Sequence, residues 1–471
     1  MMDNEPLIAL ISFGDSREDM FERRRCIFER EIGAVEQWLS LSCNIAYKFE
    51  VNNQEAVYEA VSSLRLKNVD VAILYLPIWS FPSLVVSCAK LLNNLPVLLL
   101  ANSKKETSSI GGMLGAAGGL DMVGIPHQRV VYNGPTDGLA LQKVNAFCKA
   151  AATFRRLQGK KFGCFGGRSL GIYTTTASLP VWQKLFGVDI EHLDQFMILQ
   201  EANKVQEEEV DAYFSWFLRN VGQILNDNIP QWQDALKRQI RSYIATRRLI
   251  EQYGLDFVGI KCQRELSDNY VIQCLNVAML NDPYDPVIGY KEPIVCACEA
   301  DHDGALTMQI LKMVSGGGQP TSLMDVRFKS EEGLLVLANC GASASFFAAK
   351  SVEARDNWKR VSLMPNVFGL AGGFTTQYVY EPGKATLARL CQKDGQYWMA
   401  IIGGDFVYPE EDDTVEFVKP FPCAFFKANL DFDELWETYG SNHIHAVYGD
   451  FVDVLEDFCT IAGIEAKVYA R

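Results

Sequence analysis

Short apolar runs alternate with amphipathic stretches through the first third of the chain. LIALIS, NIAYKFEV, VDVAILYLP and PVLLLAN are the apolar runs, and a charged stretch near residues 17–40 is the first of the helix-length segments between them. This alternation is typical of a doubly wound parallel sheet. We therefore predict an N-terminal α/β domain over residues 1–157, which ends in the basic, linker-like segment FRRLQGKK.

A second alternation follows the linker. KFGCFGG, VDIEHLD, DFVGIKCQ and PIVCACEAD read as strands, with a helix through VWQKLF and long helices between about residues 200 and 253. The last two strands end in polar groups, which is where open α/β sheets place their ligands. The pattern predicts a central α/β domain over residues 158–320.

The residue pattern becomes typical of β-strands in the last third of the chain, and EPGK and KDGQ are turn signals within it. The closing segments HIHAVYGD, FVDVLEDFCTIAG and IEAKVYA predict a strand, a helix and a strand. The predicted fold class is thus α/β, with two doubly wound α/β domains followed by a β-rich C-terminal domain over residues 321–471.

Composition excludes several classes of function. The chain is 48% hydrophobic and 22% charged, with a formal net charge of -14 and no Lys/Arg-rich stripe, so we expect no nucleic-acid partner. Its apolar runs are too short to span a membrane, and its start carries acidic residues where a signal peptide needs basic ones, which favours the cytoplasm. The 13 cysteines lack paired CxxC spacing, so we expect neither a disulfide framework nor a four-cysteine zinc site.

Candidate chemistry gathers in two late segments. His443 and His445 stand two apart in GSNHIHAVYGD, so a strand would place both on one face. Glu299 and Asp301 end an apolar run in CEADHDGALTM, and Asp325 ends another in LMDVRF. Helix capping explains Asp301 adequately. Two carboxylates delivered by adjacent loops also suit a hard divalent cation, so both interpretations remain open.

These segments resemble the L-fucose isomerase family, and the resemblance runs through most of the chain. It is carried by GGRSLGIYTTT with VWQKLFGVDIEHLDQ, VGIKCQRELSDNY, CEADHDGALTM, LMDVRF, AGGFTTQYV, KATLARL and SNHIHAVYGD, in the family's order. The first domain is similar only in its pattern of strands and helices.

The resemblance implies a metal-dependent aldose–ketose isomerase. Glu299, Asp325 and His443 would be the metal ligands, and Glu299 and Asp325 would also be the catalytic acid/base pair of an ene-diol mechanism. The implied cofactor is Mn²⁺, or another divalent cation such as Mg²⁺ or Co²⁺. The implied substrate is an open-chain sugar such as L-fucose or D-arabinose. A homo-oligomer, trimeric or hexameric, is also implied.

Substrate-binding groups are expected at Lys261, Gln263, Arg264 and Asn442. Structural or surface roles are comparably good explanations for the first three, and an ordinary turn residue is the better explanation for Asn442. An anionic hexose, for example a sulfonated one, is an alternative substrate because several cations stand near the motifs: Lys261, Arg264, Arg168 and Arg327.

Two other classes of function remain as alternatives. A nucleotide-binding α/β protein is suggested by KFGCFGGRSLG, which joins a strand to a helix, but its glycines do not reproduce GxGxxG. A non-catalytic sugar-binding protein would also use α/β domains around a cleft. Sugar binding alone does not require carboxylates and a histidine at metal positions, which favours the isomerase.

Overall fold

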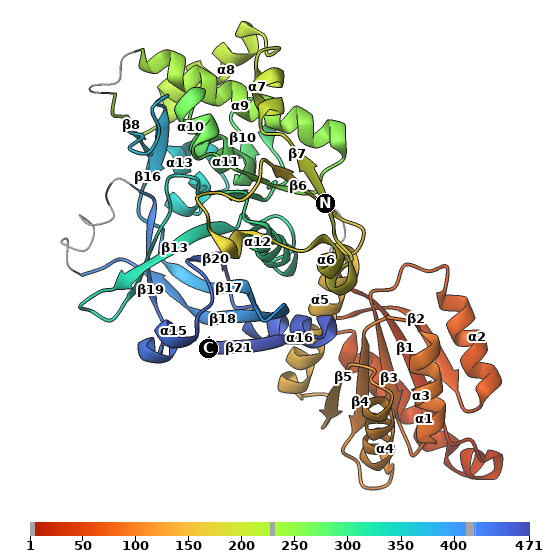
Figure 1. Ribbon diagram of the computed structural model, residues 1–471. Helices are drawn as coiled ribbons and strands as arrows, with labels where there is room; N and C mark the ends of the chain where they lie inside the picture. Colours follow the sequence, from red (N-terminus) through yellow and green to blue (C-terminus); the bar gives the residue numbers. More distant parts are fainter. Residues whose placement is uncertain (1–4, 227–230, 411–418, 420) are drawn as a thin grey trace. The chain divides into compact units, whose positions relative to one another are not determined.

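The computed structural model describes residues 5–226, 231–410, 419 and 421–471. The chain forms two compact units (Figure 1). Unit 1 comprises residues 1–158 and 453–464, and unit 2 comprises residues 159–452 and 465–471.

Unit 1 is built on a five-stranded parallel sheet with strand order β2-β1-β3-β4-β5. This order, with a helix after each strand, is that of a doubly wound sheet. The elements are β1 (Leu7–Phe13), α1 (Glu18–Leu39), β2 (Asn44–Val51), α2 (Gln54–Leu64), β3 (Val71–Leu76), α3 (Pro82–Leu91), β4 (Val97–Asn102), α4 (Ser109–Met122), β5 (His127–Tyr132) and α5 (Gly138–Leu157).

Helices cover both faces of this sheet. Residues of α2, α3 and α4 form one apolar core with alternate positions of β1, β3 and β4. Residues of α1 and α5 form a second core with the other set of alternate positions. Because β3 and β4 are buried on both faces, they read as continuous apolar runs in the sequence.

Unit 1 contains a close approach of two helices and a helix that comes from the far end of the chain. Gly115 and Gly119 of α4 lie against α3, where a Cβ at Gly119 would come within 2.7 Å of Val86. The helix α16 (Val452–Ala462) returns from the end of the chain to this unit. Its Phe458 ring packs 6.0 Å from that of Phe154.

Unit 2 begins with a four-stranded parallel sheet of order β12-β9-β6-β7. The helix α12 packs on β9 and β12 and also contacts strands β17 and β20 of the C-terminal region. The elements up to α12 are β6 (Lys161–Phe165), α6 (Leu179–Phe186), β7 (Asp189–Leu193), α7 (Phe196–Ala202), α8 (Glu207–Asn220), β8 (Gln223–Ile224), α9 (Trp232–Tyr253), β9 (Phe257–Ile260), α10 (Glu265–Asn269), α11 (Cys274–Asn281), β10 (Tyr284–Asp285), β11 (Gly289–Tyr290), β12 (Cys296–Cys298) and α12 (His302–Val314).

The rest of unit 2 is dominated by a seven-stranded sheet of order β17-β20-β13-β14-β19-β18-β21. A further pairing of β17 with β18 joins the first strand of this order to the sixth, so these strands close into a ring. The elements of this part of the chain are β13 (Ser322–Lys329), β14 (Leu335–Ala338), α13 (Ala354–Trp358), β15 (Ser362–Pro365), β16 (Phe374–Gln377), β17 (Gly383–Lys393), β18 (Gln396–Val407), β19 (Cys423–Lys427), α15 (Phe432–Thr438), β20 (His443–Tyr448) and β21 (Glu465–Ala470). Of these strands, β15 and β16 pair with β8 in a separate three-stranded sheet.

The predicted fold class is confirmed: parallel α/β sheets precede a β-rich C-terminal region. The KDGQ turn signal is confirmed as well, because Asp394 and Gly395 have positive φ and join β17 to β18. The division at residues 157 and 320 stays a prediction. Within the described residues, no helix combines the length and apolarity needed to cross a membrane.

Candidate metal and acid–base site

Strand register brings Asp325 and His443 together. β13 and β20 run antiparallel, and Asp325 lies directly opposite His443. Residues in opposed positions of neighbouring strands project to the same face of a sheet. Accordingly, Asp325 Oδ1 lies 3.6 Å from His443 Nε2, and the histidine is 1% exposed.

Glu299 reaches the same imidazole nitrogen from the central sheet. It follows β12, and both Glu299 and Ala300 have positive φ values, 60° and 50°. Left-handed backbone costs about 1 kcal/mol or more for each non-glycine residue, and such strain concentrates at functional sites. The turn places Glu299 Oε2 3.2 Å from His443 Nε2. This buried oxygen has no hydrogen-bond partner, which suits an atom that binds a cation.

A buried ion pair lies behind the histidine. Asp301 Oδ2 accepts a hydrogen bond of 2.7 Å from His443 Nδ1. Arg389 donates to both oxygens of Asp301, at 2.5 and 3.1 Å. Asp301 and Arg389 are 0% and 1% exposed. With Nδ1 donating to Asp301, the Nε2 lone pair of a neutral His443 faces Glu299 and Asp325.

Asp301 also begins α12. Its Oδ1 accepts a hydrogen bond of 2.9 Å from the backbone N–H of Gly304, so the residue is the N-cap of this helix. The capping interpretation made from the sequence is correct, and the same carboxylate orients His443. One residue therefore links the start of α12 to the site.

Electrostatics within the cluster suits a divalent cation. Burial raises the pKa of Asp325 above its ordinary value. Burial opposes the charged form of His443, but the adjacent Asp301 and Glu299 carboxylates outweigh it and raise the pKa of His443 to about 10, so a cation that binds Nε2 would displace a proton from the metal-free ring. Although burial raises the pKa of Asp301, Arg389 and His443 hold it well below its usual range. Arg389 balances the charge of Asp301, while Glu299 and Asp325 supply the negative charge that would attract a cation, although the partly exposed Arg327 lies 3.3 Å from Asp325.

The predicted substrate-binding residues lie at different distances from this cluster. Asn442 donates a 3.3 Å hydrogen bond to Asp325 Oδ1. Lys261 follows β9, and the carbonyl of Ile260, the last residue of β9, accepts a hydrogen bond from Ala300 N–H. The Lys261 amine donates a hydrogen bond of 2.6 Å to Glu265. These contacts place Lys261 at the strand end beside Glu299.

Gln263 and Arg264 follow in the next turn. The Gln263 carbonyl accepts a hydrogen bond of 3.5 Å from Ser169. The Arg264 side chain is 79% exposed and lies 3.8 Å from Asp268. Neither has a described contact with Glu299, Asp325 or His443, so their roles in substrate binding stay predictions.

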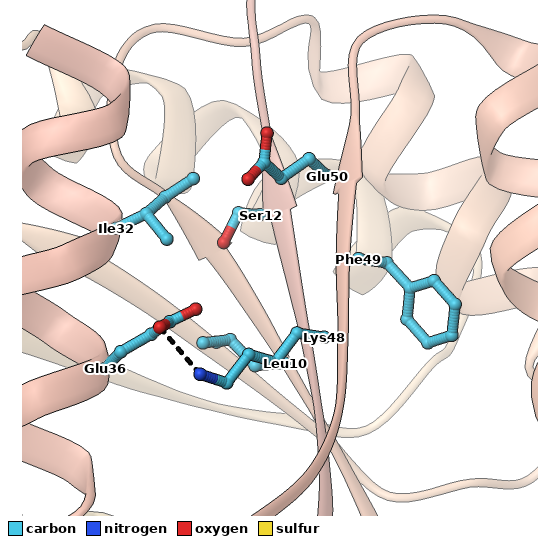
Figure 2. Close-up of a pocket in the computed structure, with 7 residues that line it drawn as sticks. All are labelled: Leu10, Ser12, Ile32, Glu36, Lys48, Phe49 and Glu50. Carbon is cyan, nitrogen blue, oxygen red and sulfur yellow. Dashed lines mark hydrogen bonds and ion pairs between the residues drawn. The ribbon is translucent and has the colours of Figure 1, made fainter. Parts of the chain in front are cut away.

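A separate pocket lies in unit 1 between α1 and the strands β1 and β2 (Figure 2). Lys48 Nζ donates a hydrogen bond of 2.7 Å to Glu36, which neutralises the one lysine in the lining. Figure 2 shows the Phe49 ring on the other side of β2 from the Lys48 and Glu50 side chains. This pocket holds none of the predicted site residues. Its lining is Leu10, Ser12, Ile32, Glu36, Lys48, Phe49 and Glu50.

Comparisons with known proteins show which sequences this chain is similar to. Residues 337–469 match the family described as L-fucose isomerase, C-terminal domain. This stretch contains His443 but neither Glu299 nor Asp325.

Several named proteins are similar over longer stretches. A sulfoquinovose isomerase of Clostridium sp. (strain MSTE9) is 25% identical over 390 residues, which is 81% of each chain. A sulfoquinovose isomerase of Priestia aryabhattai is 22% identical over 340 residues, covering 72% of this chain and 71% of that protein. An L-fucose isomerase of Vibrio vulnificus (strain YJ016) is 24% identical over 238 residues, covering 43% of this chain and 40% of that protein.

Proposed function

Because the chain is an L-fucose isomerase-like protein, we propose that it is a metal-dependent aldose–ketose isomerase of an open-chain sugar. Glu299, Asp325 and His443 are its proposed metal ligands. The observation that carries this proposal is the unpartnered, buried Glu299 Oε2, which faces His443 Nε2 beside Asp325. Two carboxylates and one imidazole suit Mn²⁺, with Mg²⁺ or Co²⁺ as alternatives.

In the proposed reaction, Glu299 and Asp325 exchange a proton with neighbouring carbons of the sugar. A C–H bond beside a carbonyl loses its proton to one carboxylate, and the adjacent carbon receives a proton in return. Burial raises the proton affinity of Asp325, which suits it to hold that proton. Asp301 keeps the imidazole of His443 oriented. The cation would supply stabilisation of the negative charge that develops on the sugar oxygens.

A sulfonated hexose is the proposed substrate, in preference to L-fucose or D-arabinose. Four of the similar proteins are named sulfoquinovose isomerase, and the similarity to one of them extends over 81% of the chain. Cationic side chains near the site can recognise a sulfonate. Arg327 is one of them, with its guanidinium 3.3 Å from Asp325 and 38% exposed.

Assembly and location complete the proposal. A homo-oligomer, trimeric or hexameric, and a cytoplasmic location remain expectations from the family resemblance and from the sequence. Neither a nucleic acid nor a membrane is a proposed partner.

The experiment uses metal-stripped protein in heavy water with Mn²⁺ and a panel of sulfoquinovose, L-fucose and D-arabinose. We expect a ketose that carries deuterium at C1, observed by NMR. Glu299→Gln and Asp325→Asn should lower the rate about 10²- to 10⁴-fold or more, since each removes an acid–base group and a ligand. Asp405→Asn, which changes an exposed aspartate on β18 of the same sheet as Asp325, is the matched control.

Two results would contradict the proposal. Failure of every aldose to yield a ketose with any divalent metal would refute the isomerase. Formation of ketose without deuterium would instead favour a hydride shift and refute proton transfer by the carboxylates, while the metal ligands would stand.

A further inference from the structure

A second group of metal-capable side chains lies in the parallel sheet of unit 2. Cys164 on β6 and His192 on β7 are register partners, so their side chains project to the same face. His302, the first residue of α12, lies over that face. One potential ligand atom from each of these residues lies within 4.8 Å of the other two.

His302 is held as metal-binding histidines usually are. Its Nδ1 lies 2.9 Å from the carbonyl oxygens of both Thr175 and Ala300. A nitrogen that faces only carbonyl oxygens must carry the proton of the neutral ring, so Nε2 retains its lone pair. A backbone carbonyl that accepts from the second nitrogen is the usual support of a histidine ligand. Aromatic neighbours fix the ring, with the Phe162 centroid 5.0 Å away.

The other two residues supply a sulfur ligand and an opening to solvent. Cys164 is buried and His192 is exposed. Zinc–sulfur and zinc–nitrogen distances place donor atoms about 3.5 Å apart in a tetrahedral site, a separation that lies inside the 4.8 Å limit within which these atoms lie. The exposed His192 side chain can adjust to the cation, and its exposure gives the cation a route of entry.

We propose that Cys164, His192 and His302 bind a borderline divalent cation, with Zn²⁺ as the preferred ion. A thiolate and two imidazoles favour Zn²⁺ or Co²⁺ over Mn²⁺ or Mg²⁺, which prefer oxygen ligands. The Cys164 thiol loses its proton to solvent when its sulfur binds the cation. The fourth ligand is a water molecule.

This site would act on α12 rather than on the sugar. His302 is the residue after Asp301, and Ala300 accepts from its ring. A cation bound to His302, β6 and β7 therefore ties the beginning of α12 to two strands of the sheet. The proposal does not depend on the isomerase activity, because its ligands are different residues.

Cobalt substitution tests the proposal directly. Metal-free protein titrated with Co²⁺ should develop a near-ultraviolet sulfur-to-cobalt charge-transfer band. The band should vanish in Cys164→Ser and weaken strongly in His192→Gln, which alters an exposed side chain and is expected to fold. It should persist in His443→Gln, which removes the ligand of the carboxylate site, and in Cys296→Ser, a buried cysteine on β12 of the same sheet.

A second readout is the thermal unfolding midpoint. Zn²⁺ should raise it in wild-type protein and in His443→Gln, and raise it less in His192→Gln. A wild-type protein without the charge-transfer band, or a band that survives Cys164→Ser, would overturn the proposal. A band lost in Cys340→Ser but kept in Cys164→Ser would also overturn it, since Cys340 lies 3.6 Å from Cys298 and would then be the thiolate ligand.

Discussion

Replacing Asp301 by Asn should separate the orientation of His443 from the capping of α12. Asn is as good an N-cap as Asp, so the hydrogen bond from Gly304 N–H is retained. With the amide oxygen in the place of Oδ1, the amide nitrogen takes the place of Oδ2 and cannot accept from His443 Nδ1, so this hydrogen bond and the negative charge are both lost. Loss of a charged partner behind a metal-binding histidine weakens metal affinity about 10- to 100-fold, or roughly 1.4 to 2.7 kcal/mol.

The same substitution should also destabilise the protein. Arg389 is 1% exposed and has Asp301 as its ion-pair partner. An uncompensated buried charge typically costs about 3 to 5 kcal/mol, so Asp301→Asn should lose stability on that scale. Denaturant unfolding of metal-free protein measures this loss, and Mn²⁺ titration by calorimetry measures the affinity.

Two further variants distinguish the effects. Asp303→Asn alters the neighbouring buried aspartate, which accepts from Trp182 and Tyr397 rather than from His443, so it should leave Mn²⁺ affinity unchanged. Asp301→Asn combined with Arg389→Met removes both charges, and should recover part of the stability without recovering the affinity. An Asp301→Asn protein that binds Mn²⁺ as tightly as wild type would refute the proposed orienting role.

Other predictions concern separate parts of the molecule. His443→Gln should weaken Mn²⁺ binding more than it slows turnover at saturating metal, because the imidazole binds the cation and transfers no proton; titration and kinetics at several metal concentrations check this. In unit 1, burial raises the pKa of Asp457 from 3.8 to about 6, so the folded state binds this proton more tightly and wild-type stability falls as pH rises between those values. Asp457→Asn should keep the hydrogen bond from Gln128 and be more stable above about pH 6, by up to about 3 kcal/mol, with the gain vanishing below about pH 4 in denaturant titrations. An active monomer in light scattering at assay concentration would contradict the expected trimer or hexamer.

The sequence pattern predicted local structure better than distant packing. The alternation of apolar runs and helices predicted the sheet of unit 1 because each strand there is buried by nearby helices. It could not show that α16 returns to unit 1, since the contact of Phe458 with Phe154 joins residues far apart in the chain. The short strand β8 was not expected, because its pairing with β15 and not its own pattern defines it.

For the candidate site, too, local motifs were informative and contacts between distant segments were not. Motifs pointed to Glu299, Asp325 and His443, and the structure brings these three together around one nitrogen. Local pattern could not show that Arg389, 88 positions from Asp301, is the buried partner of that carboxylate. A cap at the start of a helix is visible in sequence as a local pattern, whereas a second contact of the same side chain depends on the tertiary fold.

Asp301 orders the site because it both caps α12 and accepts a hydrogen bond from His443. The cap fixes the carboxylate on α12, Arg389 fixes its other edge from β17, and His443 is oriented from β20. The strained turn at Glu299 and Ala300 lies between the end of β12 and that same cap, so its left-handed backbone is fixed at both ends. Glu299 follows β12 of the four-stranded parallel sheet, and His443 lies on β20 of the closed ring of strands. Because α12 packs against both β12 and β20, its packing sets the spacing of Glu299 from His443.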